Sequence, residues 1–214
     1  MSHKPSISPE KALQQLLQGN ERFQKHQPLH HTTTGRERRE ELVSGQAPYA
    51  AVLTCSDSRT PAEHIFDAGL GDLFVCRNAG NLVDELVTGS IEFAAVHTGC
   101  PLICILGHNN CGAMGAAVTA AKNPDLHESP CIDHIIRRAL PAVLATIDNQ
   151  ADEKAWIDAA AKKNVFNQCK NLMNASQLLG KKIDEADFDI VGAWYDIGSG
   201  RVSIITRISE LTGA

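Results

Sequence analysis

Apolar and polar residues follow two different rhythms along this chain. Short, nearly continuous apolar runs, typical of strands buried on both faces, occupy 49–54, 73–76, 101–106, 190–195 and 202–206. Apolar residues three or four positions apart predict helices over 8–25, 60–68, 87–97, 112–121, 132–148 and 153–179. Because strands and helices alternate from residue 47 to residue 122, we expect a mostly parallel sheet with right-handed crossovers.

Local signals mark where several helices begin. Ser8 followed by Pro9 is typical of a helix N-cap with proline in the first turn. Thr34 with Glu37, and Thr60 with Glu63, each have the spacing of a capping box, the first opening a short charged helix. The N-terminal helix could pack on its own chain or on a partner subunit.

These elements predict an α/β fold with a central, mostly parallel sheet flanked by helices. We expect about four parallel strands plus one antiparallel edge strand, since the Asp-Ile-Gly-Ser-Gly sequence at 196–200 suggests a hairpin before the last strand. A single domain, 1–214, is expected. It comprises an N-terminal helical arm and loop (1–46), an α/β core (47–122), a helical region (123–182) and C-terminal strands (183–214).

Composition excludes several classes of function. The chain of 214 residues has a net charge of −5 and no basic stripe, so we expect no nucleic-acid partner. No apolar run approaches the ~18 residues that a membrane helix needs, and we expect no membrane association. The polar opening residues suggest that the mature protein is the whole chain, in the cytoplasm.

The seven cysteines are an odd number in a chain too large to need disulfides, so reduced thiols are expected. Cys76, Cys100 and Cys104 lie in apolar surroundings and are predicted to be core residues. The histidine cluster at positions 26, 30 and 31 lies in a threonine-rich loop and is predicted to be solvated. His64, on the helix after the first strand, is a candidate proton relay.

Two polar motifs directly follow apolar strands: Cys-Ser-Asp-Ser-Arg at 55–59 and Gly-His-Asn-Asn-Cys-Gly at 107–112. Both should lie at the carboxyl edge of the sheet, where open α/β sheets bind ligands. Together Cys55, Asp57, His108 and Cys111 offer two thiols, a carboxylate and an imidazole, a full ligand set for one tetrahedral zinc ion per chain. Arg59 can hold and orient the Asp57 carboxylate, which would either accept a hydrogen bond from a zinc-bound water or become the fourth ligand.

The two motifs, with Arg-Asn-Ala-Gly-Asn at 77–81 between them, resemble the β class of carbonic anhydrases over about residues 19 to 207. The resemblance implies reversible hydration of carbon dioxide to bicarbonate and a proton by attack of zinc-bound hydroxide. Asp57 and Arg59 would then be the catalytic residues, with no further cofactor besides zinc. It also implies a homodimer or a larger assembly, and it favours packing of the N-terminal helix on a neighbouring subunit.

Other functions are possible with the same set of zinc ligands. The chain could hydrolyse a carbon dioxide analogue, carbonyl sulfide or carbon disulfide, or it could be a non-catalytic protein that binds zinc or bicarbonate. In the bicarbonate-regulated subgroup of the family, a tryptophan accompanies an arginine and a tyrosine at an inhibitory anion site. Arg77 and Tyr195 match that site here, but Val52 replaces the tryptophan, which favours an enzyme that is open at neutral pH.

Overall fold

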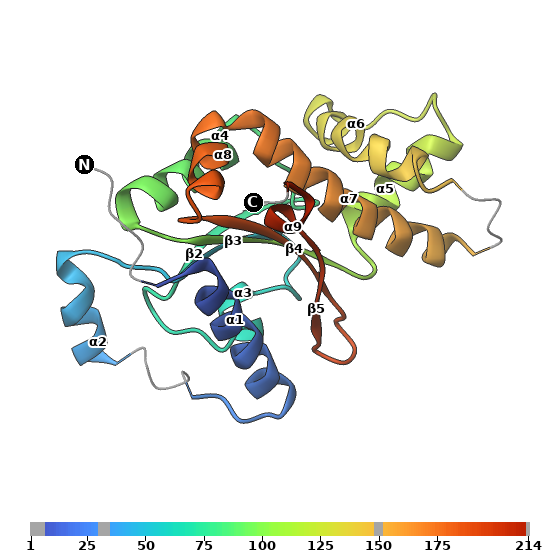
Figure 1. Cartoon of the computed structure of the whole chain (residues 1–214). Coiled ribbons are helices and arrows are strands. Elements are labelled where there is room, and N and C mark those ends of the chain that lie inside the picture. Colours follow the sequence, from blue (N-terminus) through green and yellow to red (C-terminus); the bar gives the residue numbers. More distant parts are fainter. Residues whose placement is uncertain (1–6, 30–34, 148–151, 213–214) are drawn as a thin grey trace.

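A five-stranded mixed sheet forms the centre of the protein, seen in a computed structural model that describes residues 7–29, 35–147 and 152–212. The strands lie in the order β2-β1-β3-β4-β5 (Figure 1). Their bounds are β1 Ala50–Cys55, β2 Leu73–Asn78, β3 Leu102–His108, β4 Asp189–Tyr195 and β5 Val202–Arg207. The first four are parallel, and β5 pairs antiparallel with β4 at one edge, which confirms the predicted sheet and hairpin.

Helices cover both faces of the sheet. The described helices are α1 Pro9–Gln24, α2 Arg36–Glu41, α3 Ala62–Ile65, α4 Glu85–Phe93, α5 Gly112–Lys122, α6 Pro130–Leu144, α7 Glu153–Ala175, α8 Gln177–Asp184 and α9 Ile208–Thr212. On one face α1 and α3 pack on Val52 and Cys104, whereas α4, α7 and α8 cover Leu53 and Ile105 on the other (Figure 1). Every residue of β1 and β3 is buried, because alternate side chains enter these two cores.

The N-terminal helix α1 packs on the sheet of its own chain. Ala12, Leu13 and Leu16 are buried in the same core as β1 and β3. The buried Asn20 donates to the carbonyls of Ile65 (3.1 Å) and Gly200 (2.8 Å) and accepts from the N–H of residue 202 (2.8 Å). Helix α1 thus packs on its own chain, one of the two arrangements that the sequence left open, and its packing on a neighbouring subunit stays a prediction.

Helix α7 packs closely on two glycines of the sheet, one in β3 and one in β4. A Cβ added to Gly107 of β3 would lie 2.4 Å from Cγ2 of Val165, and one added to Gly192 of β4 would lie 2.8 Å from Cγ1 of the same residue. The two methyl groups of Val165 thus occupy space that side chains on these strands would fill. This close approach brings polar residues of α7 to the carboxyl edge of the sheet.

The predicted ends of three helices differ from those in the structure. Pro61 is the N-cap of α3 rather than its first residue, so Thr60 caps nothing, and α3 ends at Ile65 instead of near residue 68. The helix predicted over 87–97 begins at Glu85 and continues after Phe93 as a π-helical turn, Ala94–Thr98. The long helix predicted to residue 179 breaks at Ser176, whose hydroxyl accepts from the N–H of Leu179 and so starts α8.

Other sequence predictions fall partly outside the described residues. Thr34, proposed to cap the short charged helix, lies there, and so do His30 and His31; the helix itself is α2. Cys100 and Cys104 are buried as predicted, while Cys76 is half-buried and packs against the core. Among the described residues, no helix is long and apolar enough to cross a membrane.

Candidate metal centre

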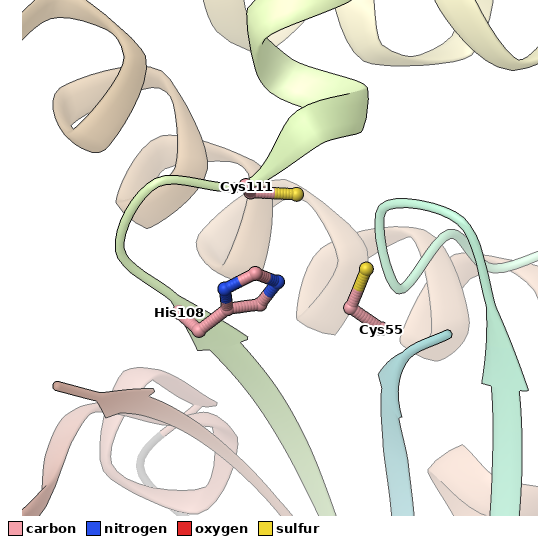
Figure 2. A group of neighbouring side chains, drawn as sticks. All are labelled: Cys55, His108 and Cys111. Atoms are coloured by element: carbon pink, nitrogen blue, oxygen red, sulfur yellow. The ribbon is translucent and has the colours of Figure 1, made fainter. Parts of the chain in front are cut away.

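Three side chains that could hold a metal ion meet where β1 and β3 end. Cys55 is the last residue of β1, His108 is the last of β3, and Cys111 is the N-cap of α5. Because β1 and β3 are parallel neighbours, their carboxyl ends lie side by side. The ligand atoms of the three residues lie within 4.8 Å of one another, and Figure 2 shows the two sulfurs and the imidazole turned toward a common space.

The imidazole of His108 has one nitrogen engaged and one available. Its Nδ1 lies 2.9 Å from the carbonyl oxygen of Asn109, which fixes Nδ1 as the donor. Its Nε2 is buried and has no hydrogen-bond partner within the described part of the chain. A buried lone pair without a partner is costly, and a metal ion would satisfy it.

The two thiols interact strongly with each other. The interaction between the two thiols lowers the pKa of Cys55 and, together with burial, raises the pKa of Cys111, so the pair releases its first proton easily and its second reluctantly. The N–H of Gly80 donates to Sγ of Cys55 at 3.4 Å and further favours its thiolate. Two thiols that share a proton beside an unpartnered imidazole nitrogen fit a zinc ion, which binds thiolates and displaces protons.

Asp57 lies beside this group but outside it. Its carboxylate accepts two bonds from the Arg59 guanidinium, Nε to Oδ1 at 2.9 Å and Nη2 to Oδ2 at 2.7 Å, and a third from the Arg59 N–H at 2.9 Å. The Arg59 guanidinium beside it holds the pKa of Asp57 well below its usual range. Arg59 also donates to the carbonyl of Asn110 at 3.2 Å, so it joins the two motif loops.

Residues that the sequence did not mark as site residues hold the loop after β1. Arg77 of β2 donates to the carbonyls of Cys55 (3.0 Å) and Asp57 (2.7 Å), and the Thr60 hydroxyl lies within hydrogen-bond distance of the same two carbonyls. The sequence placed Arg77 in the 77–81 motif and at an anion site, and Thr60 in a helix cap, but it predicted neither of these contacts with the loop. The sequence could not show the contacts of Arg77, because its partners lie 22 and 20 residues away in the chain.

The loop around His108 is held from two other elements. The Asn109 side chain accepts from the N–H of Ile197 at 2.9 Å and lies 3.3 Å from Asp196, both in the β4–β5 turn. Asp158 of α7 accepts from the N–H of Asn110 at 2.8 Å. An acidic residue on the polar face of a helix carries no sequence signal for such a role.

His64 lies in a different part of the molecule. It is exposed on α3 and lines a cavity of about 720 Å³ together with Phe23 and His26, between α1 and the loop that precedes β2. Cys55, His108 and Cys111 do not line this cavity. The proposed relay role of His64 therefore gains no geometric support.

Comparisons with known proteins agree with this geometry. The family model described as carbonic anhydrase matches residues 50–202. The chain is 36% identical over 207 residues to carbonic anhydrase 2 of Mycobacterium tuberculosis, covering 97% of this chain and 98% of the relative. It is 33% identical to a carbonic anhydrase of Pseudomonas aeruginosa, covering 79% of this chain and 78% of the relative. Among solved structures, one of two tetrameric β-carbonic anhydrases from Sordaria macrospora aligns with a TM-score of 0.73 at 27% identity, covering 91% of this chain and 97% of that one.

Proposed function

Because this chain belongs to the β class of the carbonic anhydrase family, we propose that it catalyses the reversible hydration of carbon dioxide to bicarbonate and a proton. The observation that carries the proposal is the convergence of Cys55, His108 and Cys111, with Nε2 of His108 buried and without a partner in the described chain. Three protein ligands, rather than four, are typical of a catalytic zinc site that keeps one position for a reactant.

We assign one zinc ion per chain to Cys55, His108 and Cys111. Two thiolates and a neutral imidazole would balance the charge of the ion. When bound there, zinc supplies Lewis-acid chemistry that makes a water molecule acidic enough to act as a nucleophile near neutral pH. Binding would release the proton that the two thiols share.

We assign the catalytic roles to Asp57 and Arg59. Because the pKa of Asp57 is lowered, its carboxylate stays ionised at neutral pH and can only accept hydrogen bonds. It is therefore suited to orient the reacting water, while the paired bonds from Arg59 fix the direction of the carboxylate. If Asp57 turned away from Arg59 and became the fourth ligand, as the sequence also allows, both of these bonds would be lost, which favours the paired state.

We also propose that the protein is a homodimer or a larger homo-oligomer. The solved relative from Sordaria macrospora is tetrameric, and here α4 leaves Leu86 83% exposed and Phe93 50% exposed, with the Phe93 ring 6.5 Å from that of Phe74 on the edge strand β2. Exposed large apolar side chains next to a free strand edge are typical of a subunit contact. A cytoplasmic location is proposed from the seven cysteines, all of which are free.

Stopped-flow hydration of carbon dioxide by metal-quantified protein, from about pH 6.5 to about pH 9, tests the proposal. We expect one zinc per chain and a rate that falls sharply in Asp57→Ala. The specificity constant for carbonyl sulfide, measured on the same samples, should be far below that for carbon dioxide. A zinc-loaded protein without hydration activity across this range would refute the proposed reaction.

A further inference from the structure

The loop between β2 and α4, residues 79–83, provides a main-chain donor to a sulfur of the candidate metal site. The N–H of Gly80 points at Sγ of Cys55, at 3.4 Å. Gly80 and Asn81 both adopt positive φ, +83° and 46°, so this loop needs support to keep its shape. Residues that keep the loop in place therefore also maintain the hydrogen bond from Gly80 to the Cys55 sulfur.

Two buried amides of α7 support this loop. Asn164 is 1% exposed and donates from Nδ2 to the carbonyl of Gly80 at 2.9 Å. Gln168, one helical turn later and 3% exposed, accepts at Oε1 from the N–H of Val83 at 2.9 Å. The two side chains are joined to each other, Nε2 of Gln168 to Oδ1 of Asn164, at 2.8 Å.

The directions of these bonds fix one another. The N–H of Val83 needs an acceptor, so Gln168 must turn its oxygen to the loop and its NH₂ group to Asn164. Asn164 must then present its oxygen to Gln168 and its NH₂ group to the Gly80 carbonyl. The Gly80 carbonyl and the Val83 N–H are thus both hydrogen-bonded, and only one orientation of each amide side chain allows this.

Burying the amide groups of Asn164 and Gln168 costs free energy unless each polar atom has a hydrogen-bond partner. Two amides in the interface between a helix and a sheet lose hydration that apolar side chains of similar size would not lose. Here their four polar atoms face each other and the loop, and Asn171 adds a second donor to Oε1 of Gln168 at 3.3 Å. The close approach of α7 to the sheet over Gly107 places them within reach.

We infer that Asn164 and Gln168 are positioning residues for the metal centre: by clamping residues 80–83, they keep the Gly80 N–H on the Cys55 sulfur and thereby set how tightly that thiolate binds metal. The inference rests on the proposed zinc site. A hydrogen bond to a ligating thiolate holds the sulfur in its ligating position and lowers the energy of its lone pairs, and residues that hold such outer contacts typically weaken metal affinity by about 10- to 100-fold when lost.

The test compares Asn164→Leu and Gln168→Met, which keep size and remove the polar groups, with Leu172→Ala, a fully buried α7 position whose side chain has no polar atom to offer the loop. Zinc dissociation constants are measured by chelator competition. Cobalt is then substituted, and the sulfur-to-cobalt charge-transfer band is recorded. Urea unfolding of the metal-free proteins reports general loss of stability.

We expect both polar variants to bind zinc at least about tenfold more weakly, with the charge-transfer band moved to lower energy because the sulfur has lost a donor. Leu172→Ala should lose stability but keep the wild-type affinity and band. Wild-type affinity and band in both polar variants, or equal shifts in Leu172→Ala, would overturn the inference. A wild-type chain that binds no zinc would overturn the proposed function together with it.

Discussion

The contact between Val165 and Gly107 allows a quantitative test of how closely α7 packs on the sheet. A methyl group at position 107 would lie 2.4 Å from Cγ2 of Val165, too close for either to remain in place. Overpacking of this kind in a close-packed core costs about 1–3 kcal/mol of unfolding free energy for Gly107→Ala. The clash should push α7 outward at the point where β3 leads into His108.

Val165→Ala removes the opposing methyl groups. Val165 is fully buried, so the loss of two carbons should cost about 2 kcal/mol, counting transfer at about 0.8 kcal/mol per carbon and a cavity contribution. In the double variant the new methyl group at 107 enters the space that Cγ2 leaves. The unfolding free energy of the double variant should therefore be at least about 1 kcal/mol higher than the sum of the losses in the two single variants predicts.

Urea unfolding of the metal-free single, double and wild-type proteins measures this coupling. The metal-free form is used so that metal binding does not contribute to the unfolding free energy. Gly19→Ala provides a comparison at a distant contact, where the added Cβ would lie 1.8 Å from the Phe66 carbonyl oxygen and Val165→Ala should give no relief. Strict additivity of Gly107→Ala and Val165→Ala would refute the reasoning.

Four other outcomes follow from the site and the core. Cys55→Ser should bind less than one tenth of the wild-type zinc, measured by elemental analysis, and should lose hydration activity, because a hydroxyl is a poor zinc ligand at neutral pH; retained activity would contradict the assignment. Because the folded-state pKa of Asp57 is depressed, its pairing with Arg59 stabilises the fold above the unfolded pKa of about 4, and this contribution is lost as pH falls toward the folded pKa. Urea unfolding should accordingly show Asp57→Asn less stable than wild type near pH 7, with the difference shrinking toward about pH 3; a constant difference would count against the pairing. Removing zinc with a chelator should lower the unfolding midpoint, and zinc at about a thousand times its dissociation constant should restore about 4 kcal/mol. Asn20→Ala should cost about 3 kcal/mol in thermal or urea unfolding, since three buried backbone groups lose their partner; an effect below about 0.5 kcal/mol would show that water replaces the side chain.

The sheet, and the meeting of Cys55, His108 and Cys111 at its carboxyl edge, could be predicted because each depends on local pattern. Fully apolar runs identify β1 and β3, and the carboxyl ends of parallel neighbours meet, so Cys55 and His108 had to lie close together. Helix ends were predicted less well. Thr60 has the spacing of a helix cap, yet its hydroxyl lies against main-chain carbonyls of the motif loop, an interaction that only the folded chain creates.

The support of the site could not be predicted, for a physical reason. Asn164 and Gln168 lie four residues apart in a long helix, where polar residues at that spacing are usually a solvated face. They are buried because glycines at 107 and 192 let α7 approach the sheet, and their hydrogen bonds span 84 and 85 residues. No spacing rule connects positions so far apart.

The hydrogen bonds of Asn20 also limit how early helix α1 can be fixed on the sheet while the chain is being synthesised. Its partners Gly200 and Val202 are 180 and 182 residues further along, so the ribosome must work on the order of ten to forty seconds before they exist. Until then the sheet surface on which the apolar face of α1 packs lacks strand β5. Helix α1 can therefore be locked in place only after residues 200–202 have been made, long after its own synthesis.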